Sequence, residues 1–327
     1  MKKFIKLFNK VGGKEILKQY VRAHVLLFSF VNVIVIGFSK KSLEIARNSV
    51  NNRILCKLRK KYNRFITDYL KQHKSNLHHE KSDKVWVCWL QGMDDAPYLV
   101  QKCFKSLKTN LYNKEIVLLT EENYRNYVKF PHHIQKKINS GIITRTHMSD
   151  LLRLELLNNY GGTWIDATVY CSGNKIPEYM LNSDLFLFQD LKPGLDGHAT
   201  RISSWFMTAC SNHPILLLTQ EMLYDYWENH NYMIDYFLLH DFFELAIETY
   251  PNEWRKVIPF SNSTPHILLL RLFDEYNDDT WNAIKDSCCF HKLTYKFTPE
   301  NIRSKNSYYD KIIKENDLEK GDFSDAN

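Results

Sequence analysis

The sequence lacks a regular cysteine framework. Its seven cysteines are scattered, none forms a C-x-x-C pair, and no second pair accompanies Cys288 and Cys289. Disulfide scaffolds of small secreted proteins and zinc sites both need paired or conserved-looking spacings. The pattern therefore argues against both and favours reduced thiols in a cytosolic protein.

The N-terminal part also lacks an apolar run long enough to cross a bilayer, which takes about 20 residues. The apolar run Val25–Phe38 is shorter, and it begins too late for a secretory signal. We interpret it as a buried or an interfacial segment, which neighbouring basic side chains would hold at an anionic leaflet. An ordinary core helix with a solvated basic face fits the same pattern equally well.

Acidic residues are scarce at the start of the chain. Residues 1–74 contain 18 basic residues but only three acids, which gives this part a net charge of +15 against +7 for the whole chain. Such a segment predicts an anionic partner, either a membrane or a nucleic acid. The chain has no G-F-x-F signature, no zinc-finger spacing and no interleaving of the basic residues with stacking aromatics, which disfavours nucleic acid.

Composition divides the chain into three parts. We expect residues 1–80 to form a basic, helical, membrane-associating region that runs into a polar linker at 71–84. Residues 84–303 would form the main domain, and residues 304–327 a polar C-terminal tail. In the main domain, short apolar runs alternate with helical patterns, which predicts an α/β fold with a mainly parallel sheet. Ligands of such sheets bind at the carboxyl ends of the strands.

The clearest predicted helix covers 149–160, with Ser149 as its N-cap and Gly161 as its end. Residues 164–170 should then form a strand, a tight break and a second strand. We further expect strands at 85–89, 116–119, 185–188 and 205–209, and helices at 96–108, 132–140, 215–227 and 234–249.

The acid Asp166 stands inside the apolar, β-branched run 164–170. A buried carboxylate is costly unless it is paired or bound to a metal. At a strand end that faces a cleft, it could hold magnesium or manganese, and the phosphates of a substrate would complete such a site. Taken alone, Asp166 is more often a turn former, so the hypothesis depends on the residues around it.

Those residues carry a resemblance. Asp150-x-x-Arg153, Tyr160-Gly-Gly162 and Asp166-x-Thr168 resemble the D-x-x-R, Y-G-G and D-x-D signature of nucleotide-sugar glycosyltransferases. The version W-I-D-A-T-V-Y resembles the bacterial capsular polysaccharide synthesis family. Further similar blocks begin at Trp86, Tyr226, Asp235 and His291, so that the likeness covers roughly 85–297. It implies a GT-A-type, Rossmann-like domain that binds a nucleotide sugar.

The resemblance also implies a metal site. Asp166 matches the first acid of D-x-D, and Thr168 replaces the second, so that its role as a metal ligand is in doubt. His291 matches a late metal-ligand position of related enzymes. A divalent cation is therefore expected, manganese more than magnesium, and an imidazole beside a carboxylate suits manganese better than calcium.

Other positions of the family's motifs would bind the donor or take part in the reaction. Asp235 matches a position near the reacting face of the sugar, and together with Asp166 and Arg153 it forms the predicted catalytic set. Residues expected to bind the donor are Trp89, Gln91, Gly92, Asp150, Arg153, Gly162, Thr168 and Lys292.

The function that the resemblance implies is transfer of a hexose, galactose or glucose, from a UDP-sugar, with retention. The acceptor would be an undecaprenyl-diphosphate-linked sugar of capsule assembly. The enzyme would lie in the cytoplasm, attached to the inner face of the membrane by its basic region. A catalytically inactive glycan-binding relative and a basic nucleic-acid-binding protein are the alternatives.

Overall fold

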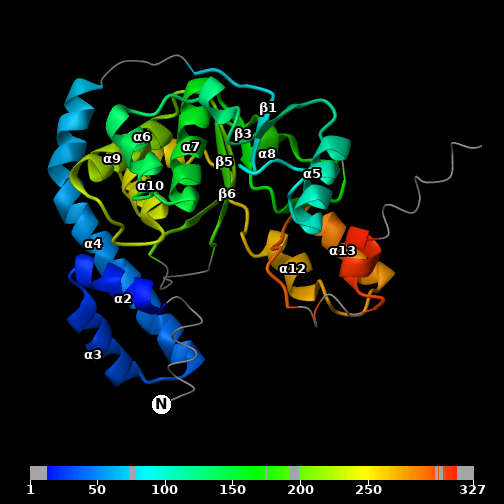
Figure 1. Cartoon of the computed structure of the whole chain (residues 1–327), viewed down its shortest axis with the longest axis horizontal. Helices are drawn as coiled ribbons and strands as arrows, with labels where there is room; N and C mark the ends of the chain where they lie inside the picture. The colour runs from blue at the N-terminus through cyan, green and yellow to red at the C-terminus, as the bar shows by residue number, and fades with distance from the viewer. Residues whose placement is uncertain are drawn as a thin grey trace, which may run out of the picture.

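A five-stranded sheet with the strand order β2-β1-β3-β6-β5 forms the centre of the molecule (Figure 1). The computed structural model describes residues 13–73, 79–173, 175–191, 199–298, 301 and 305–314. β1 pairs in parallel with β2 and β3, whereas β6 runs antiparallel to β3 and β5. Four strands thus share one direction, which confirms the prediction of a mainly parallel sheet. The strands are β1 (Lys84–Cys88), β2 (Glu115–Leu119), β3 (Gly162–Ile165), β5 (Leu185–Gln189) and β6 (Ile202–Ala209).

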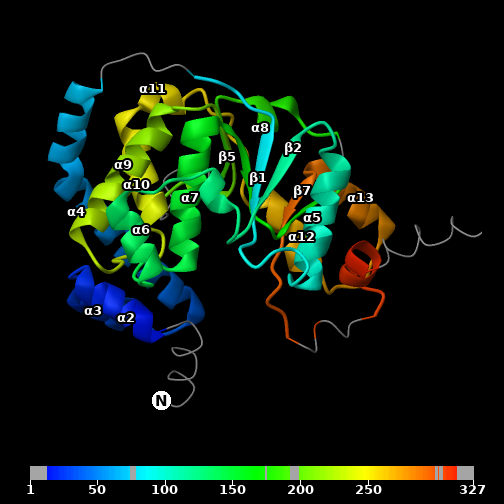
Figure 2. The ribbon, with the colours of Figure 1, turned by 45° about the horizontal axis from the view of Figure 1, so that its top comes forward.

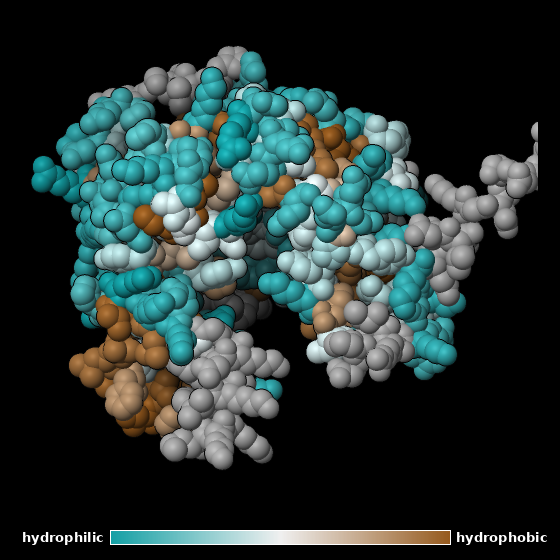
Figure 3. Space-filling view, viewed as in Figure 1, coloured by the Kyte–Doolittle hydropathy of each residue, from teal (hydrophilic) through white to brown (hydrophobic). Residues whose placement is uncertain are grey.

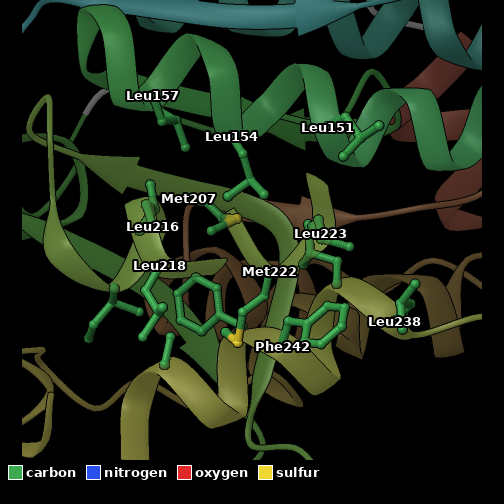
Figure 4. Packing of buried hydrophobic residues seen from close by; sticks show 14 of the residues in the cluster. Leu151, Leu154, Leu157, Met207, Leu216, Leu218, Met222, Leu223, Leu238 and Phe242 are labelled. Carbon is green, nitrogen blue, oxygen red and sulfur yellow. The ribbon is translucent and has the colours of Figure 1, made fainter. Parts of the chain in front are cut away.

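Alternating residues of the strands enter two separate hydrophobic clusters, because successive strand side chains point to opposite faces. Trp86 and Trp164 lie in the larger cluster, whereas Val87 and Ile165 lie in the smaller one. Figure 4 shows Leu151 and Leu154 of helix α7 (Arg145–Tyr160) on the same side as Met207 of β6, within the larger cluster. The helices of the larger cluster are α4 (Lys40–Gln72), α6 (His132–Asn139), α7 (Arg145–Tyr160), α9 (Pro214–Asn229) and α10 (Leu238–Thr249). Those of the smaller cluster are α5 (Tyr98–Asn110) and α8 (Glu178–Asn182).

A second, two-stranded sheet pairs β4 (Val169–Cys171) with β7 (Phe290–Lys292) in antiparallel fashion. A third hydrophobic cluster lies beside it, and it includes Tyr308 and Ile313. Residues 305–314 of the expected polar tail therefore pack against the body, while 315–327 lie outside the described residues. The remaining elements here are α11 (Pro251–Trp254), α12 (Ile267–Arg271), α13 (Asp278–Ser287) and the short helical turns η1 (Tyr124–Asn126), η2 (Thr264–His266) and η3 (Tyr309–Lys314).

The N-terminal region is helical, with α2 (Gly13–Arg22) and α3 (Leu26–Ile36) leading into α4. Figure 2 shows α2 and α3 close together, below one end of α4. α4 packs on the body, since Val50 and Ile54 lie in the same cluster as α9 and α10. In contrast, no residue of α3 is buried. Apart from Val25, which is buried, the segment 25–38 is therefore neither a buried segment nor an ordinary core helix. An interfacial segment stays a prediction.

The predicted strands and helices of the main domain are present, with corrected boundaries. α7 begins at Arg145, and the side chain of Thr144 caps it by accepting the His147 N–H, so that Ser149 is not the N-cap. Residues 234–237 precede α10 instead of opening it. The linker begins later than expected because α4 continues to Gln72, and 74–78 lie outside the described residues.

Candidate functional site

A cavity of about 490 Å³ lies at the edge of the sheet where β3 and β5 end. Its walls come from α4, the start of α7, the start of β6 and the segment 235–241. Five residues of the predicted site line it: Asp150, Arg153, Asp166, Asp235 and Lys292. The fold thus brings together, at the carboxyl ends of strands, residues that are up to 142 positions apart in the chain.

Asp166 directly follows β3, in the turn that leads to β4. Its backbone N–H donates to the carbonyl of Trp205 (2.8 Å), and its own carbonyl accepts the N–H of Val169 (3.0 Å), so that the turn is held on both sides. The carboxylate accepts the indole N–H of Trp164 (3.0 Å) and the ammonium of Lys292 (2.7 Å). Burial alone would raise the pKa of Asp166. The positive charges of Lys292 and Arg153 together have a larger effect in the opposite direction, so that the pKa of Asp166 lies below its ordinary value.

Arg153 lies between the two carboxylates of the cavity. Its guanidinium donates to Asp150 (2.6 Å), approaches Asp166 (3.5 Å) and stacks over the ring of Trp164, 4.9 Å from its centre. The other oxygen of Asp150 lies 3.5 Å from His147. Because the arginine is buried and holds both acids, we regard it as a positioning residue.

Lys292 reaches the cavity from the second sheet. β7 pairs Lys292 with Val169, and the N–H of Leu293 donates to the carbonyl of Thr168 (3.0 Å). This register places the ammonium between Asp166 and the hydroxyl of Thr168, 2.8 Å away. Thr168 therefore touches Lys292 at the position that the resemblance to D-x-D assigns to the second acid.

Asp235 also lines the cavity and is 6% exposed. Its carboxylate accepts the N–H of Phe237 (2.8 Å). Burial raises the pKa of Asp235 to about 6, although this hydrogen bond and the nearby Arg47 oppose the rise. A carboxyl group accepts hydrogen bonds when it is ionised and can also donate one when it is protonated.

His291 does not reach the cavity. Neighbouring strand residues point to opposite sides, so that His291 faces away from the side that Lys292 faces. It is fully buried between the rings of Tyr170 and Trp281, and its Nε2 lies 2.8 Å from the hydroxyl of Ser172. Burial lowers the pKa of His291 to about 3.

The residues present do not fit a divalent metal at Asp166. Both carboxylate oxygens already contact cations, since Arg153 approaches one and Lys292 binds the other. Thr168 is neutral, and His291 is absent from the cavity lining. Across the part of the chain that the structure describes, no three His, Cys, Asp or Glu side chains form a group that could hold a metal ion.

The remaining predicted donor residues lie outside the cavity lining. Trp89, Gln91 and Gly92 form the loop after β1, whose carboxyl end adjoins that of β3. Gly162 lies at the other end of β3, where a Cβ atom would stand 2.3 Å from the carbonyl oxygen of Lys84. This glycine thus permits close backbone packing, and it is not among the residues that line the cavity.

Several cavity residues escaped sequence reasoning. One of them is Asp190, which directly follows β5 as Asp166 directly follows β3. The carboxylate of Asp190 accepts a hydrogen bond from the side-chain amide of Asn262 (3.0 Å). The amide oxygen of Asn262 in turn accepts the indole N–H of Trp205 (2.9 Å). The same rule, an acid directly after a buried strand, would have found Asp190. α4 adds Glu44, Arg47, Asn48 and Asn51, which share one helix face through their spacing of three and four.

Comparisons with known proteins complete this description. A family model described as "Capsular polysaccharide synthesis protein" matches residues 35–312. No curated protein matches the chain. Eight chains of solved structures match. Among them is "PaToxG Glycosyltransferase", at 11% identity and a TM-score of 0.37, with 80% of this chain and 95% of that chain covered. From a likeness this distant we draw nothing.

Proposed function

The chain belongs to the family of capsular polysaccharide synthesis proteins, and from this premise we propose that it is a glycosyltransferase that uses a UDP-hexose. The observation that carries the proposal is the cavity at the carboxyl ends of β3 and β5, with Asp166, Asp150, Arg153 and Lys292 joined in one network. An α/β sheet binds its ligands at this edge.

The reaction moves the sugar from the diphosphate to a hydroxyl group. The bond between C1 of the sugar and the β-phosphate oxygen breaks, and its electron pair stays on the phosphate. C1 bonds to the acceptor oxygen, whose proton passes to the departing phosphate. Negative charge therefore grows on the diphosphate, and fixed cations in a partly dry cavity stabilise it. Galactose and glucose are the proposed sugars, and transfer proceeds with retention.

Each residue has a proposed part in this step. Lys292 faces the diphosphate, and Asp166 and Arg153 hold the ammonium and the cavity wall in place. Asp235, which also lines the cavity, accepts a hydrogen bond from a hydroxyl of the sugar. The acceptor is an oligosaccharide on a lipid diphosphate, the undecaprenyl type by analogy with the family. It enters along the α4 wall, where Arg47 lines the cavity.

The proposal predicts release of UDP from one member of a UDP-sugar panel. Purified full-length protein would be incubated with UDP-glucose, UDP-galactose and their N-acetyl forms, and free UDP would be measured with and without a lipid-linked acceptor. We expect one donor to be consumed at least tenfold faster than the others, because a hydrogen-bonded sugar site discriminates strongly. Binding of UDP without turnover of any donor, even with acceptor, would instead indicate an inactive glycan-binding relative.

A further inference from the structure

The contacts of Lys292 indicate which positive charge meets the diphosphate of the donor. Its ammonium group has three N–H donors, and Asp166 (2.7 Å) and Thr168 (2.8 Å) accept two of them. Lys292 lines the cavity with 19% of its side chain exposed, so that the third donor is available to an anion there. The two polar residues of the D-x-T motif, Asp166 and Thr168, thus both bind the ammonium group of Lys292.

The same position in D-x-D enzymes would hold a cation of another kind. A second carboxylate adds a negative charge that favours a divalent ion, whereas the hydroxyl of Thr168 adds none. Near Asp166, a divalent ion would meet the ammonium of Lys292 and the guanidinium of Arg153. Two fixed positive charges within reach of one carboxylate repel such an ion.

We propose that Lys292 takes the place of the divalent metal, so that the enzyme binds and uses the diphosphate of its donor without a metal ion. Asp166 and Thr168 orient the ammonium, and Arg153 fixes Asp166. His291 is then structural, in accord with its burial and its contact with Ser172. This inference rests on the proposed function.

Calorimetric binding of UDP tests the inference, with EDTA in one buffer and manganese in the other. We expect the Kd for UDP to differ less than twofold between the buffers. Lys292→Met should weaken UDP binding at least tenfold in both buffers, whereas uridine, which lacks phosphates, should bind the variant and the wild type equally. Lys292→Arg keeps the charge and should recover part of the affinity. As a matched control, Lys285→Met removes a lysine of α13, outside the cavity lining, and should change nothing.

The other outcomes are distinct. UDP binding that requires manganese would overturn the inference and leave the proposed function intact. Equal loss of UDP and uridine binding in Lys292→Met would show a merely structural lysine and also overturn it. Absence of UDP binding in both buffers would overturn the proposed function, and the inference with it.

A separate observation concerns the surface of α3. Every described residue of this helix is at least partly exposed, and Leu27 and Val35 are each 77% exposed. Figure 3 shows a hydrophobic patch at the lower left, where α3 lies. Its other large members are Leu26, Phe28, Phe30, Val31, Ile34 and Phe38. Apolar patches of this kind on a soluble body mark contact with another apolar surface.

Basic residues lie beside this patch. Lys40 and Lys41 follow α3, and Arg53 of α4 lies over the ring of Phe28 (5.7 Å). Among the described residues, no helix is long and apolar enough to cross a membrane. At about 1.5 Å per residue, the 11 residues of α3 cover about half of a bilayer core of about 30 Å.

We infer that α3 is a docking surface for an anionic lipid bilayer, in which it lies flat at the interface. Its apolar side chains enter the headgroup region while the basic residues beside them meet anionic lipids. A second copy of the chain could cover the apolar residues, but it would bring the same basic residues and therefore would not neutralise the positive charge beside them. This inference stands without the proposed function.

α4 connects the docking surface to the cavity. α3 contacts α4 through Asn32 and Ser49 (3.3 Å), and the neighbouring residues Arg47, Asn48 and Asn51 line the cavity. The cavity wall is therefore one face of the helix whose other face supports α3. An acceptor whose lipid lies in the bilayer would therefore have its sugar close to the cavity, because α3 holds the enzyme at the same bilayer.

Sedimentation with vesicles tests the surface, with phosphatidylcholine alone or with added phosphatidylglycerol. We expect binding only to the anionic vesicles and a loss of at least tenfold in affinity for the double variant Leu27→Glu/Val35→Glu. Leu270→Glu is the matched control, because Leu270 is 78% exposed on the distant helix α12 and should leave binding unchanged. Ultracentrifugation without lipid would follow the oligomeric state in parallel.

Two results would overturn the bilayer inference. One is equal vesicle binding by the double variant and the wild type. The other is a wild-type dimer that the double variant breaks, with no vesicle binding by either. UDP release without vesicles should be the same for wild type and variant, which separates this test from that of the proposed function.

Discussion

Replacement of Asp166 by asparagine is expected to lower kcat/KM for sugar transfer about 10²–10³-fold, the cost of removing one preorganised electrostatic group from a reaction centre. The amide has the shape of the carboxylate but not its charge, so that it no longer holds Lys292 at 2.7 Å or attracts Arg153. On the proposed function, the ammonium then loses its fixed position at the diphosphate of the donor. The measurement is UDP release at several donor concentrations, with circular dichroism to confirm that the variant folds.

A second aspartate offers a matched control for this variant. Asp184 also pairs with a lysine, Lys81 (3.2 Å), but it precedes β5 and thus lies at the opposite edge of the sheet from the cavity. Asp184→Asn should therefore change kcat/KM less than twofold. Full activity in Asp166→Asn would show that the network around Asp166 does not serve the reaction.

Gly162→Ala is expected to destabilise the fold by about 2–5 kcal/mol. The backbone of Gly162 has φ +94°, where an L-residue is strained by about 1–2 kcal/mol. In addition, the new Cβ would stand 2.3 Å from the carbonyl oxygen of Lys84, and overpacking of this kind costs about 1–3 kcal/mol. Because Lys84 opens β1, relief of the clash would disturb the pairing of the two central strands. Urea unfolding measures the change as a shift of the midpoint at constant m value.

Gly92→Ala separates the two contributions. Its φ is +83°, but no atom lies within 4 Å of a Cβ placed there. We expect a loss of only about 1–2 kcal/mol, from backbone strain alone. Equal losses in the two variants would show that the close approach to Lys84 contributes nothing.

Much of the sheet could be predicted from the sequence, because its strands are short apolar runs flanked by polar turns. The break after Ile165, with Asp166 in it, was predicted for the same reason and is present. Helix ends were less predictable. Ser149 is as good a cap as Thr144, and only the packing of His147 and Met148 into the core decides that α7 begins earlier.

The site itself was predicted in part. Asp150 and Arg153 lie three residues apart on one helix, so that their pairing follows from local geometry. The contact between Asp166 and Lys292 could not be predicted, because it depends on the register of β4 and β7. A shift of one residue in that register would have brought His291 to the cavity in place of Lys292. The wall from α4 depends on tertiary packing that no local pattern encodes.

The distance along the chain between Asp166 and Lys292 has a consequence for synthesis of the protein. The two residues are 126 positions apart, and translation adds about 5–20 residues per second. A ribosome therefore takes about 6–25 s to supply the lysine after the aspartate. During this interval the first sheet can begin to form, but the carboxylate lacks its counter-ion and the cavity lacks one wall. The site around Asp166 is therefore incomplete until almost all of the chain has been made.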